Sequence, residues 1–153
     1  MNKQIIFILI FLMPYIGYAQ SIQPIIHNKT YSGLSVPLKN FGKPERIIKG
    51  GENECSGGFF PNQYVYRDIT LSDQGQVYSV IMNRNNGLVF YHKKIDVSMG
   101  KTKFLQLFKD LVWQSEEHPN VYYAESEEDS TTIITFIFKD ERLIKYKIST
   151  NDC

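Results

Sequence analysis

The chain has 153 residues, with 17 Lys and Arg against 16 Asp and Glu, 42% hydrophobic residues and two cysteines. This length and mixed composition fit one ordinary globular domain and argue against a disordered tail, a collagen-like rod or a protein with several membrane spans. The near-neutral charge gives no reason to expect a nucleic-acid partner, because proteins that bind phosphate backbones usually carry a marked basic excess.

The start of the chain has the pattern of a secretory signal peptide. Lys3 is followed by a short apolar run, and Gly17 and Ala19 are the small residues expected three and one before a cleavage site. An uncleaved anchor is disfavoured, because a membrane-spanning helix needs about 20 apolar residues. We therefore predict that residues 1–19 are a signal peptide and that residues 20–153 form a single domain, which is secreted or periplasmic.

Export also decides how the two cysteines are interpreted. In an oxidising compartment Cys55 and Cys153 are predicted to form a disulfide. The alternative is two free thiols. The loop closed by this bond spans most of the domain, so the bond would contribute about 4–5 kcal/mol in the chain-entropy model. The cysteines and histidines lack the spacing of a metal site, and no cofactor is expected.

The first half of the chain is predicted to contain short elements. They are a lead-in strand or arm over 20–32, a brief strand over 34–36, helical turns over 37–41, an extended segment over 46–49, and a glycine-rich loop over 50–62. Aromatic and branched residues then predict strands over 64–66, 69–71, 77–82, 88–91 and 95–97, with turns over 72–75 and 83–87.

One amphipathic helix is predicted over residues 102–113. Its apolar residues recur at steps of three and four, and Thr102 is a suitable N-cap; the apolar residues are Phe104, Leu105, Phe108, Leu111 and Val112. This stripe is interpreted as a core face, and a partner-binding groove is the alternative. Three strands are predicted to close the chain, over 121–124, 132–138 and 143–148.

The last strand has one buried and one solvated face, since Ile144, Tyr146 and Ile148 alternate with Lys145 and Lys147. A sheet with one solvated face is typically antiparallel. The predicted fold class is therefore α+β, an antiparallel sheet with one main amphipathic helix.

The two halves of the chain also resemble each other. Residues 34–82 and 95–148 each run from a strand through a helix and a loop to three strands, and the alignment places Val80 over Tyr146. Two tandem repeats of a helix and a β-meander would explain this pattern. The alternative is that any two units of this kind look alike.

A short segment is similar to a known group of proteins. Phe41-Gly42-Lys43-Pro44-Glu45, between a helical fragment and a strand, resembles the LGxP segment of small exported bacterial domains, with Phe41 in place of the usual Leu. In that group a β-meander follows, which Tyr64-Val65-Tyr66 resembles. The group includes β-lactamase-inhibitor-like proteins and small outer-membrane-assembly lipoproteins. The resemblance implies an α+β fold whose sheet packs helices on one face and presents the other face to a protein.

The sequence lacks the common catalytic patterns. There is no Gly-x-Ser-x-Gly motif and no phosphate-binding loop, and His27, His92 and His118 are interpreted as surface or loop residues rather than bases. The acidic run over 125–129 lacks the spacing of a calcium loop and is interpreted as a solvated loop. We predict no catalytic residue, and the chain is not expected to be an enzyme.

Exposed tyrosines supply the remaining functional signal. Tyr64, Tyr66, Tyr122 and Tyr123 lie on predicted strands, and aromatic residues on a rigid sheet are typical of protein-binding surfaces. The alternative is that these rings cover the edges of a small core. The favoured hypothesis is an exported protein-binding domain of the inhibitor or immunity-protein type. An envelope-assembly or surface-structural component and, less favoured, a small hydrolase are the alternatives.

Overall fold

The computed structural model describes residues 21–55, 57–127 and 131–150. The predicted signal peptide and Cys153 lie outside the described residues, so the cleavage and the disulfide stay predictions. The elements are β1 Ile22–Ile26, β2 Lys29–Thr30, the 3-10 helix η1 Leu38–Asn40, β3 Arg46–Ile48, β4 Gln63–Val65, β5 Ile69–Ser72, β6 Val77–Ile81, β7 Gly87–Phe90, β8 Lys93–Ile95, α1 Lys101–Phe108, β9 Trp113–Gln114, β10 Val121–Glu125, β11 Thr132–Lys139 and β12 Arg142–Thr150.

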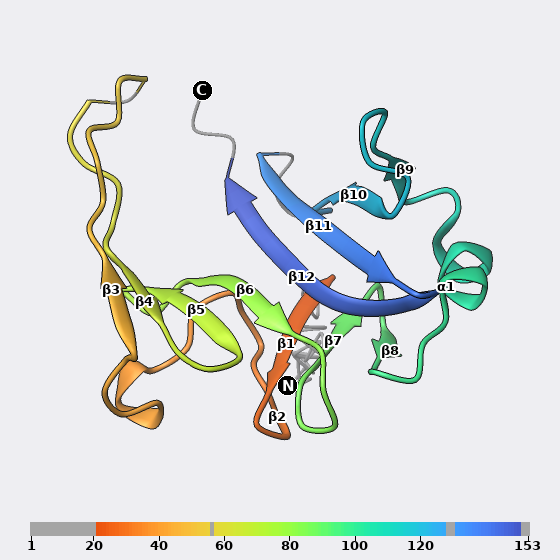
Figure 1. The fold of residues 1–153 in the computed structure, drawn as a ribbon, viewed down its shortest axis with the longest axis horizontal. Coiled ribbons are helices and arrows are strands. Elements are labelled where there is room, and N and C mark those ends of the chain that lie inside the picture. The colour runs from red at the N-terminus through yellow and green to blue at the C-terminus, as the bar shows by residue number, and fades with distance from the viewer. Residues whose placement is uncertain (1–20, 56, 128–130, 151–153) are drawn as a thin grey trace, which may run out of the picture.

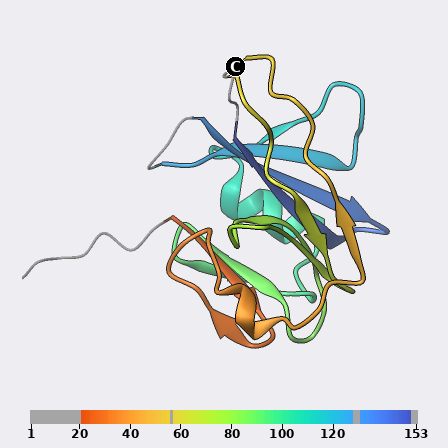
Figure 2. The same cartoon turned by 90° about the vertical axis from the view of Figure 1, so that its left-hand side faces the viewer.

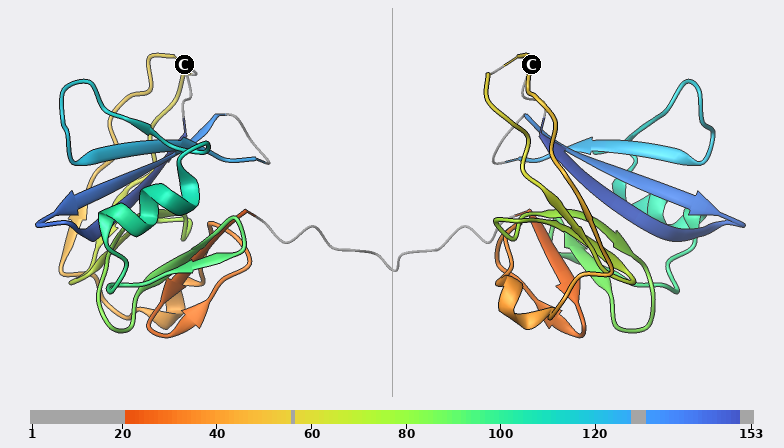
Figure 3. Two further views of the ribbon diagram at one scale, coloured as in Figure 1. Left: turned by 90° about the vertical axis from the view of Figure 1, so that its right-hand side faces the viewer. Right: turned by 60° about the vertical axis from the view of Figure 1, so that its left-hand side comes forward.

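The strands form two antiparallel sheets (Figure 1). The smaller sheet has four strands in the order β2-β1-β7-β8, and the larger has eight in the order β3-β4-β5-β6-β12-β11-β10-β9. The sheets lie as two layers, and α1 closes one side of the space between them (Figure 3). Each sheet therefore combines strands from both halves of the chain.

The predicted α+β class is wrong, because the described residues form a mainly β fold. The helix is shorter than its apolar stripe predicts: α1 ends at Phe108, where the backbone N–H groups of Leu111 and Val112 both bond to the Phe108 carbonyl. Trp113 already begins β9, and the residue preceding the helix is Gly100 rather than the predicted cap Thr102. No helix in the described ranges is both long and apolar enough to cross a membrane.

Two further segments differ from their predicted structure. The brief strand predicted over 34–36 is reduced to a single bridge between Ser35 and Gln76, and the loop predicted over 50–62 continues the β3–β4 hairpin through a bridge between Glu52 and Phe59. The lead-in segment, predicted as a strand or an arm, contains β1, whose Ile22 and Ile26 are buried. The Ser35–Gln76 bridge joins residues far apart in the chain, which local sequence does not encode, whereas the Glu52–Phe59 bridge extends a local hairpin.

Aromatic rings fill the space between the layers. Phe90 of β7 and Phe136 of β11 face each other from the two sheets with ring centroids 5.3 Å apart. The helix inserts Phe104 and Phe108 beside them, at 4.8 Å from Phe136 and 5.0 Å from Phe90 respectively. All four rings are buried, and close aromatic pairs of this kind contribute about 0.5–1.5 kcal/mol each beyond the area that they bury.

The order of the strands is symmetric about the centre of each sheet. The two central strands of the large sheet are β6 and β12, where Val80 lies opposite Tyr146, and those of the small sheet are β1 and β7, where Pro24 lies opposite Leu88. A two-fold axis would place equivalent residues opposite each other in this way. The topology is therefore the one that two packed half-repeats would give, and the common origin of the halves stays a prediction.

A buried tyrosine links the two layers at this centre. Tyr146 is fully buried in β12, and its hydroxyl donates a hydrogen bond of 3.1 Å to the carbonyl oxygen of Gly87, the first residue of β7. A buried phenol without a partner would cost free energy, so the bond holds β7 at a fixed position against the large sheet. Burial also raises the pKa of Tyr146 well above its ordinary value.

Tyr146→Phe tests this link. We expect the free energy of unfolding to fall by about 1 to 2 kcal/mol, because the ring still packs but the Gly87 carbonyl loses its partner. Urea denaturation measures the change. Tyr123→Phe makes the same chemical change on a half-buried ring and is expected to leave the stability unaltered. Equal losses in both variants would contradict the role of the bond.

The raised pKa of Tyr146 also predicts instability at high pH. The native state keeps the phenol proton above the ordinary pKa of 10.0, while the unfolded state loses it. Stability is therefore fully present below pH 10 and declines above it, by at most about 1.4 kcal/mol per pH unit from this group. Tyr66, whose pKa burial also raises, adds to the decline. The slope of unfolding free energy against pH should be smaller in Tyr146→Phe.

Candidate functional site

The large sheet has one face on the core and one face toward solvent. Along β11 and β12 buried residues alternate with more exposed ones, so Phe136 and Tyr146 point inward. Register partners on neighbouring strands share a face, and Lys145 pairs with Ile81. We call the outward surface the open face; it carries Arg46, Ile48, Ile81, Tyr123, Lys145 and Lys147.

Apolar side chains are exposed along this open face. Ile48 and Ile81 are 39% and 44% exposed, and Trp113 at the edge strand β9 is 46% exposed. Trp113 lies directly opposite Tyr123 of β10, with ring centroids 6.0 Å apart. Aromatic rings fixed by cross-strand pairing lose little freedom on binding, which is a property of the anchor residues of protein interfaces.

The open face is hollowed near its centre. A depression of about 230 Å³ extends across β3, β4, β5, β6 and β12, and its lining includes Ile48, Ile81 and Lys145. Residues from five strands line the same hollow, so this part of the sheet is concave. A concave, partly apolar surface can accept a convex element of another protein.

The charge on the strands of this sheet is strongly biased. Glu125 is the only acidic residue within the bounds of these described strands, whereas the basic residues are Arg46, Lys139, Arg142, Lys145 and Lys147. Lys145 is half-buried, and burial lowers its pKa, with repulsion from Lys147 as the second cause. Lys145 has no ion pair within the part of the chain that the structure describes. The hollow is lined by the basic residues Arg46, Arg67 and Lys145 and by one acidic residue, Asp68, so its lining carries a net positive charge.

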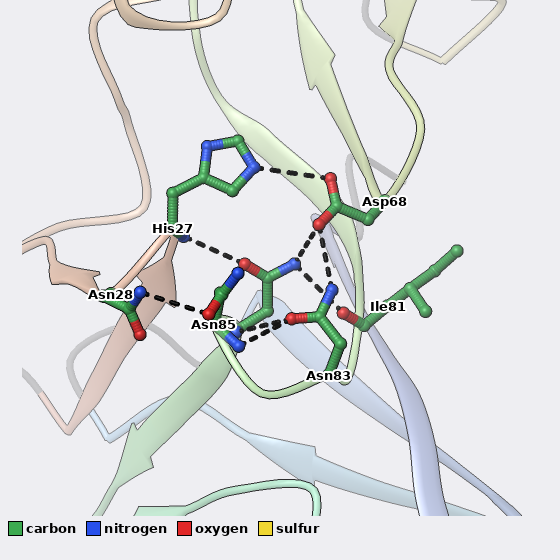
Figure 4. Close-up of polar contacts among 7 residues, drawn as sticks. His27, Asn28, Asp68, Ile81, Asn83 and Asn85 are labelled. Carbon is green, nitrogen blue, oxygen red and sulfur yellow. Dashed lines mark hydrogen bonds and ion pairs between the residues drawn. The ribbon is translucent and has the colours of Figure 1, made fainter.

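A second group of polar residues lies where three turns meet (Figure 4). Asp68, between β4 and β5, contacts His27 from the β1–β2 turn, with 3.5 Å between Oδ1 and the imidazole Nε2. Its other oxygen accepts hydrogen bonds from the side-chain amides of Asn83, at 3.0 Å, and Asn86, at 2.6 Å. This polar cluster joins the two sheets at the segment that connects β6 to β7.

Asn86 is the buried centre of the polar cluster. Its Oδ1 accepts the backbone N–H of His27 at 2.9 Å, and its amide nitrogen also donates to the carbonyl of Ile81 at 3.2 Å. The backbone N–H of Asn86 bonds to the side chain of Asn83. Each polar atom is used to fix a turn, which explains how a 2% exposed amide is accommodated.

The polar cluster forms one wall of a pocket of about 530 Å³. His27 and Asp68 line it beside the rings of Phe41 and Tyr66, which are 5.7 Å apart. The contact between His27 and Asp68 is the only ion pair of a histidine with a carboxylate among the described residues. Among the described residues, no serine, threonine or cysteine lines this pocket, and its one side-chain hydroxyl belongs to Tyr66.

The other two histidines lie elsewhere. His92 occupies the turn between β7 and β8 with a positive φ, and His118 lies in the exposed segment between β9 and β10, where its backbone bonds to Ser115. The three histidines do not converge on one site. The described residues also contain no group of three or more His, Cys, Asp or Glu side chains placed to hold a metal ion.

The four tyrosines predicted as a binding surface do not share one surface. Tyr122 is buried against Phe138, so its ring belongs to the core. Tyr64 pairs with buried Leu71 and lies on the core side of β4, and Tyr66 packs on Phe41 at the pocket. Only Tyr123 lies on the open face.

The apolar stripe predicted Trp113 as the last residue of the helix, so the sequence did not indicate that Trp113 pairs with Tyr123. The lysines of the open face were visible in the sequence, since their alternation in the last strand predicts a solvated face. The same alternation wrongly placed Ile144 on the buried face: Ile144 is 38% exposed, and Leu143 takes the buried position. The polar cluster had no such signal, because His27, Asp68 and Asn86 are far apart in the chain.

Comparison of the chain with protein-family models, curated proteins and solved structures finds no match. The resemblance to inhibitor-like and envelope-assembly domains is therefore neither supported nor opposed.

Asn86→Asp tests the polar cluster. The new carboxylate would face Asp68 and the Ile81 carbonyl, replacing two donated hydrogen bonds with repulsion in a buried position. We expect a loss of about 3 kcal/mol in unfolding free energy. Asn85→Asp is the matched control, because Asn85 is exposed and its amide oxygen alone accepts a bond, from Asn28. Thermal or urea unfolding that ranks the two variants equally would contradict the assignment.

Proposed function

We propose that this chain is an exported, non-enzymatic protein-binding domain of the inhibitor or immunity-protein type, which acts in the periplasm or outside the cell. Its contact surface is the open face, and its partner presents an acidic surface. The observation that carries the proposal is the half-buried Lys145, which has no ion pair among the described residues, at the centre of a concave and partly apolar sheet.

The open face is large enough for a stable complex. Eight strands about 4.8 Å apart span about 38 Å, and strands of about five residues are about 17 Å long. The area of the face, the product of these two lengths, is roughly 650 Å². This is close to the roughly 800 Å² that each partner buries in an interface of standard size. A partner covering this face would therefore need little more surface than the sheet itself provides.

The electrostatics favour an acidic partner. Burial and, second, repulsion from Lys147 lower the pKa of Lys145, and a carboxylate placed against Lys145 would favour its charged form against both. The protein as a whole is close to neutral, with a formal net charge of +1, so this attraction is local to the sheet. Local complementarity of this kind raises association rates and excludes partners of like charge.

The variant Lys145→Glu tests the proposed surface. A photo-crosslinking residue at position 81, on the open face, is used to capture the partner from the envelope and medium fractions of the source cells, and the purified pair is then titrated. We expect Lys145→Glu to weaken binding at least about 10-fold, because it places an anion opposite an acidic surface.

Lys103→Glu is the matched control, since it makes the same charge change on the exposed side of α1, away from the open face. It should bind like the unmodified protein. The proposal fails if position 81 captures no protein, or if Lys103→Glu and Lys145→Glu weaken binding equally. Thermal unfolding of both variants verifies that each is folded.

A further inference from the structure

The β3–β4 hairpin extends far beyond its paired strands as an arm, which we define as residues 49–62. The arm rises from one edge of the large sheet, away from the body of the protein (Figures 1 and 2). Its two sides remain hydrogen bonded: the Phe60 N–H bonds to the Gly51 carbonyl at 2.9 Å, and the Asn53 N–H to the Gly58 carbonyl at 3.0 Å. The described part of the arm is thus an ordered ladder.

The base of the arm is braced against the neighbouring turn. The side chain of Asn62 accepts the Gly50 N–H at 3.1 Å and donates to Asp73, in the β5–β6 turn, at 3.0 Å. Gly50 is required here, because a Cβ atom at this position would lie 1.6 Å from the Phe60 carbonyl oxygen. The arm is therefore held in one direction before any partner arrives, which lowers the entropic cost of binding.

Two large apolar side chains are exposed near the tip of this arm. Phe59 is 75% exposed and Phe60 is 46% exposed. Glu52 pairs with Phe59 in the same register that pairs Ile48 with Gln63, so by strand alternation Phe59 lies on the side of the open face and Phe60 on the other. Exposed phenylalanines on both sides of a narrow projection favour insertion into a cleft rather than contact with a flat surface.

The charges of the arm distinguish its partners. Glu52 and Glu54 flank the phenylalanines, and the only basic residue of the arm is Lys49, at its base. Segments that insert into anionic membranes carry basic residues instead, because anionic lipids repel carboxylates. An apolar cleft with a basic rim on a protein would accept both the rings and the carboxylates.

We propose that the arm inserts Phe59 and Phe60 into an apolar cleft with a basic rim on a partner protein, the same partner that covers the open face. This inference rests on the proposed function and adds the second contact of the complex. The arm continues the edge strands of the open face, so one rigid body would present both contacts.

The test uses the full mature protein with a photo-crosslinking phenylalanine analogue at position 59, and separately at position 81. We expect both positions to capture the same protein, and the peptide linked to position 59 to line an apolar cleft edged by Lys or Arg. The double variant Phe59→Ser with Phe60→Ser should bind that protein about 30-fold or more weakly, as expected for removal of hot-spot aromatics. Leu107→Ser, an exposed change on α1, is the matched control and should bind normally.

Three results would overturn the inference. Capture from position 81 but not from position 59 would reject the arm contact and leave the open-face proposal standing. Capture from position 59 but not from position 81 would reject the shared partner, because the open face would then lie outside the interface. Flotation with phosphatidylcholine vesicles that the unmodified protein shows and the double variant loses would identify the arm as a membrane contact instead. Thermal unfolding should be the same for the double variant and the unmodified protein, since both rings are exposed.

Discussion

The hydrogen bond from Tyr146 to Gly87 is the constraint on which the arrangement of the two layers depends. Tyr146 lies opposite Val80 at the centre of the large sheet, and Gly87 begins the central strand β7 of the small sheet. A Cβ atom on Gly87 would lie 2.6 Å from the Ile95 carbonyl oxygen, so glycine is what allows β7 and β8 to approach. The buried hydroxyl of Tyr146 and the absence of a side chain at Gly87 together set the position of one sheet on the other.

From this centre the two halves of the chain differ in how they fill the interior. The second half supplies α1, whose Phe104 and Phe108 complete an aromatic core with Phe90 and Phe136. The place of α1 in the strand order is taken in the first half by η1, a single 3-10 turn. This turn inserts less volume into the interior than α1 does. The pocket and the hydrogen-bonded polar cluster lie on the side of η1. The symmetry of the strands is therefore accompanied by an asymmetry of the core.

The sequence predicted local structure better than the fold. The strand predicted over 132–138 is confirmed as β11, and the alternating lysines of β12 identified an exposed sheet face, because a strand has a period of two residues. The fold class was wrong because the described strands pair into two antiparallel sheets around one short α-helix, and strand pairing takes Trp113 out of the predicted helix into β9. The pairing of β6 with β12 and the contacts of Asn86 join residues distant in sequence, which no local pattern reports.

The net charge of the chain conceals how that charge is distributed. Acidic residues lie mostly outside the strands of the large sheet, and its basic residues gather on strands that share one surface. Lys145 is held there at the cost of a lowered pKa, which a partner carboxylate would relieve. The arm carries the opposite charge to the strands of the large sheet, since Glu52 and Glu54 lie near its phenylalanines. A partner that matched only one of these surfaces would leave the other opposed or unused, so two adjacent regions of opposite charge define a more selective fit than either alone.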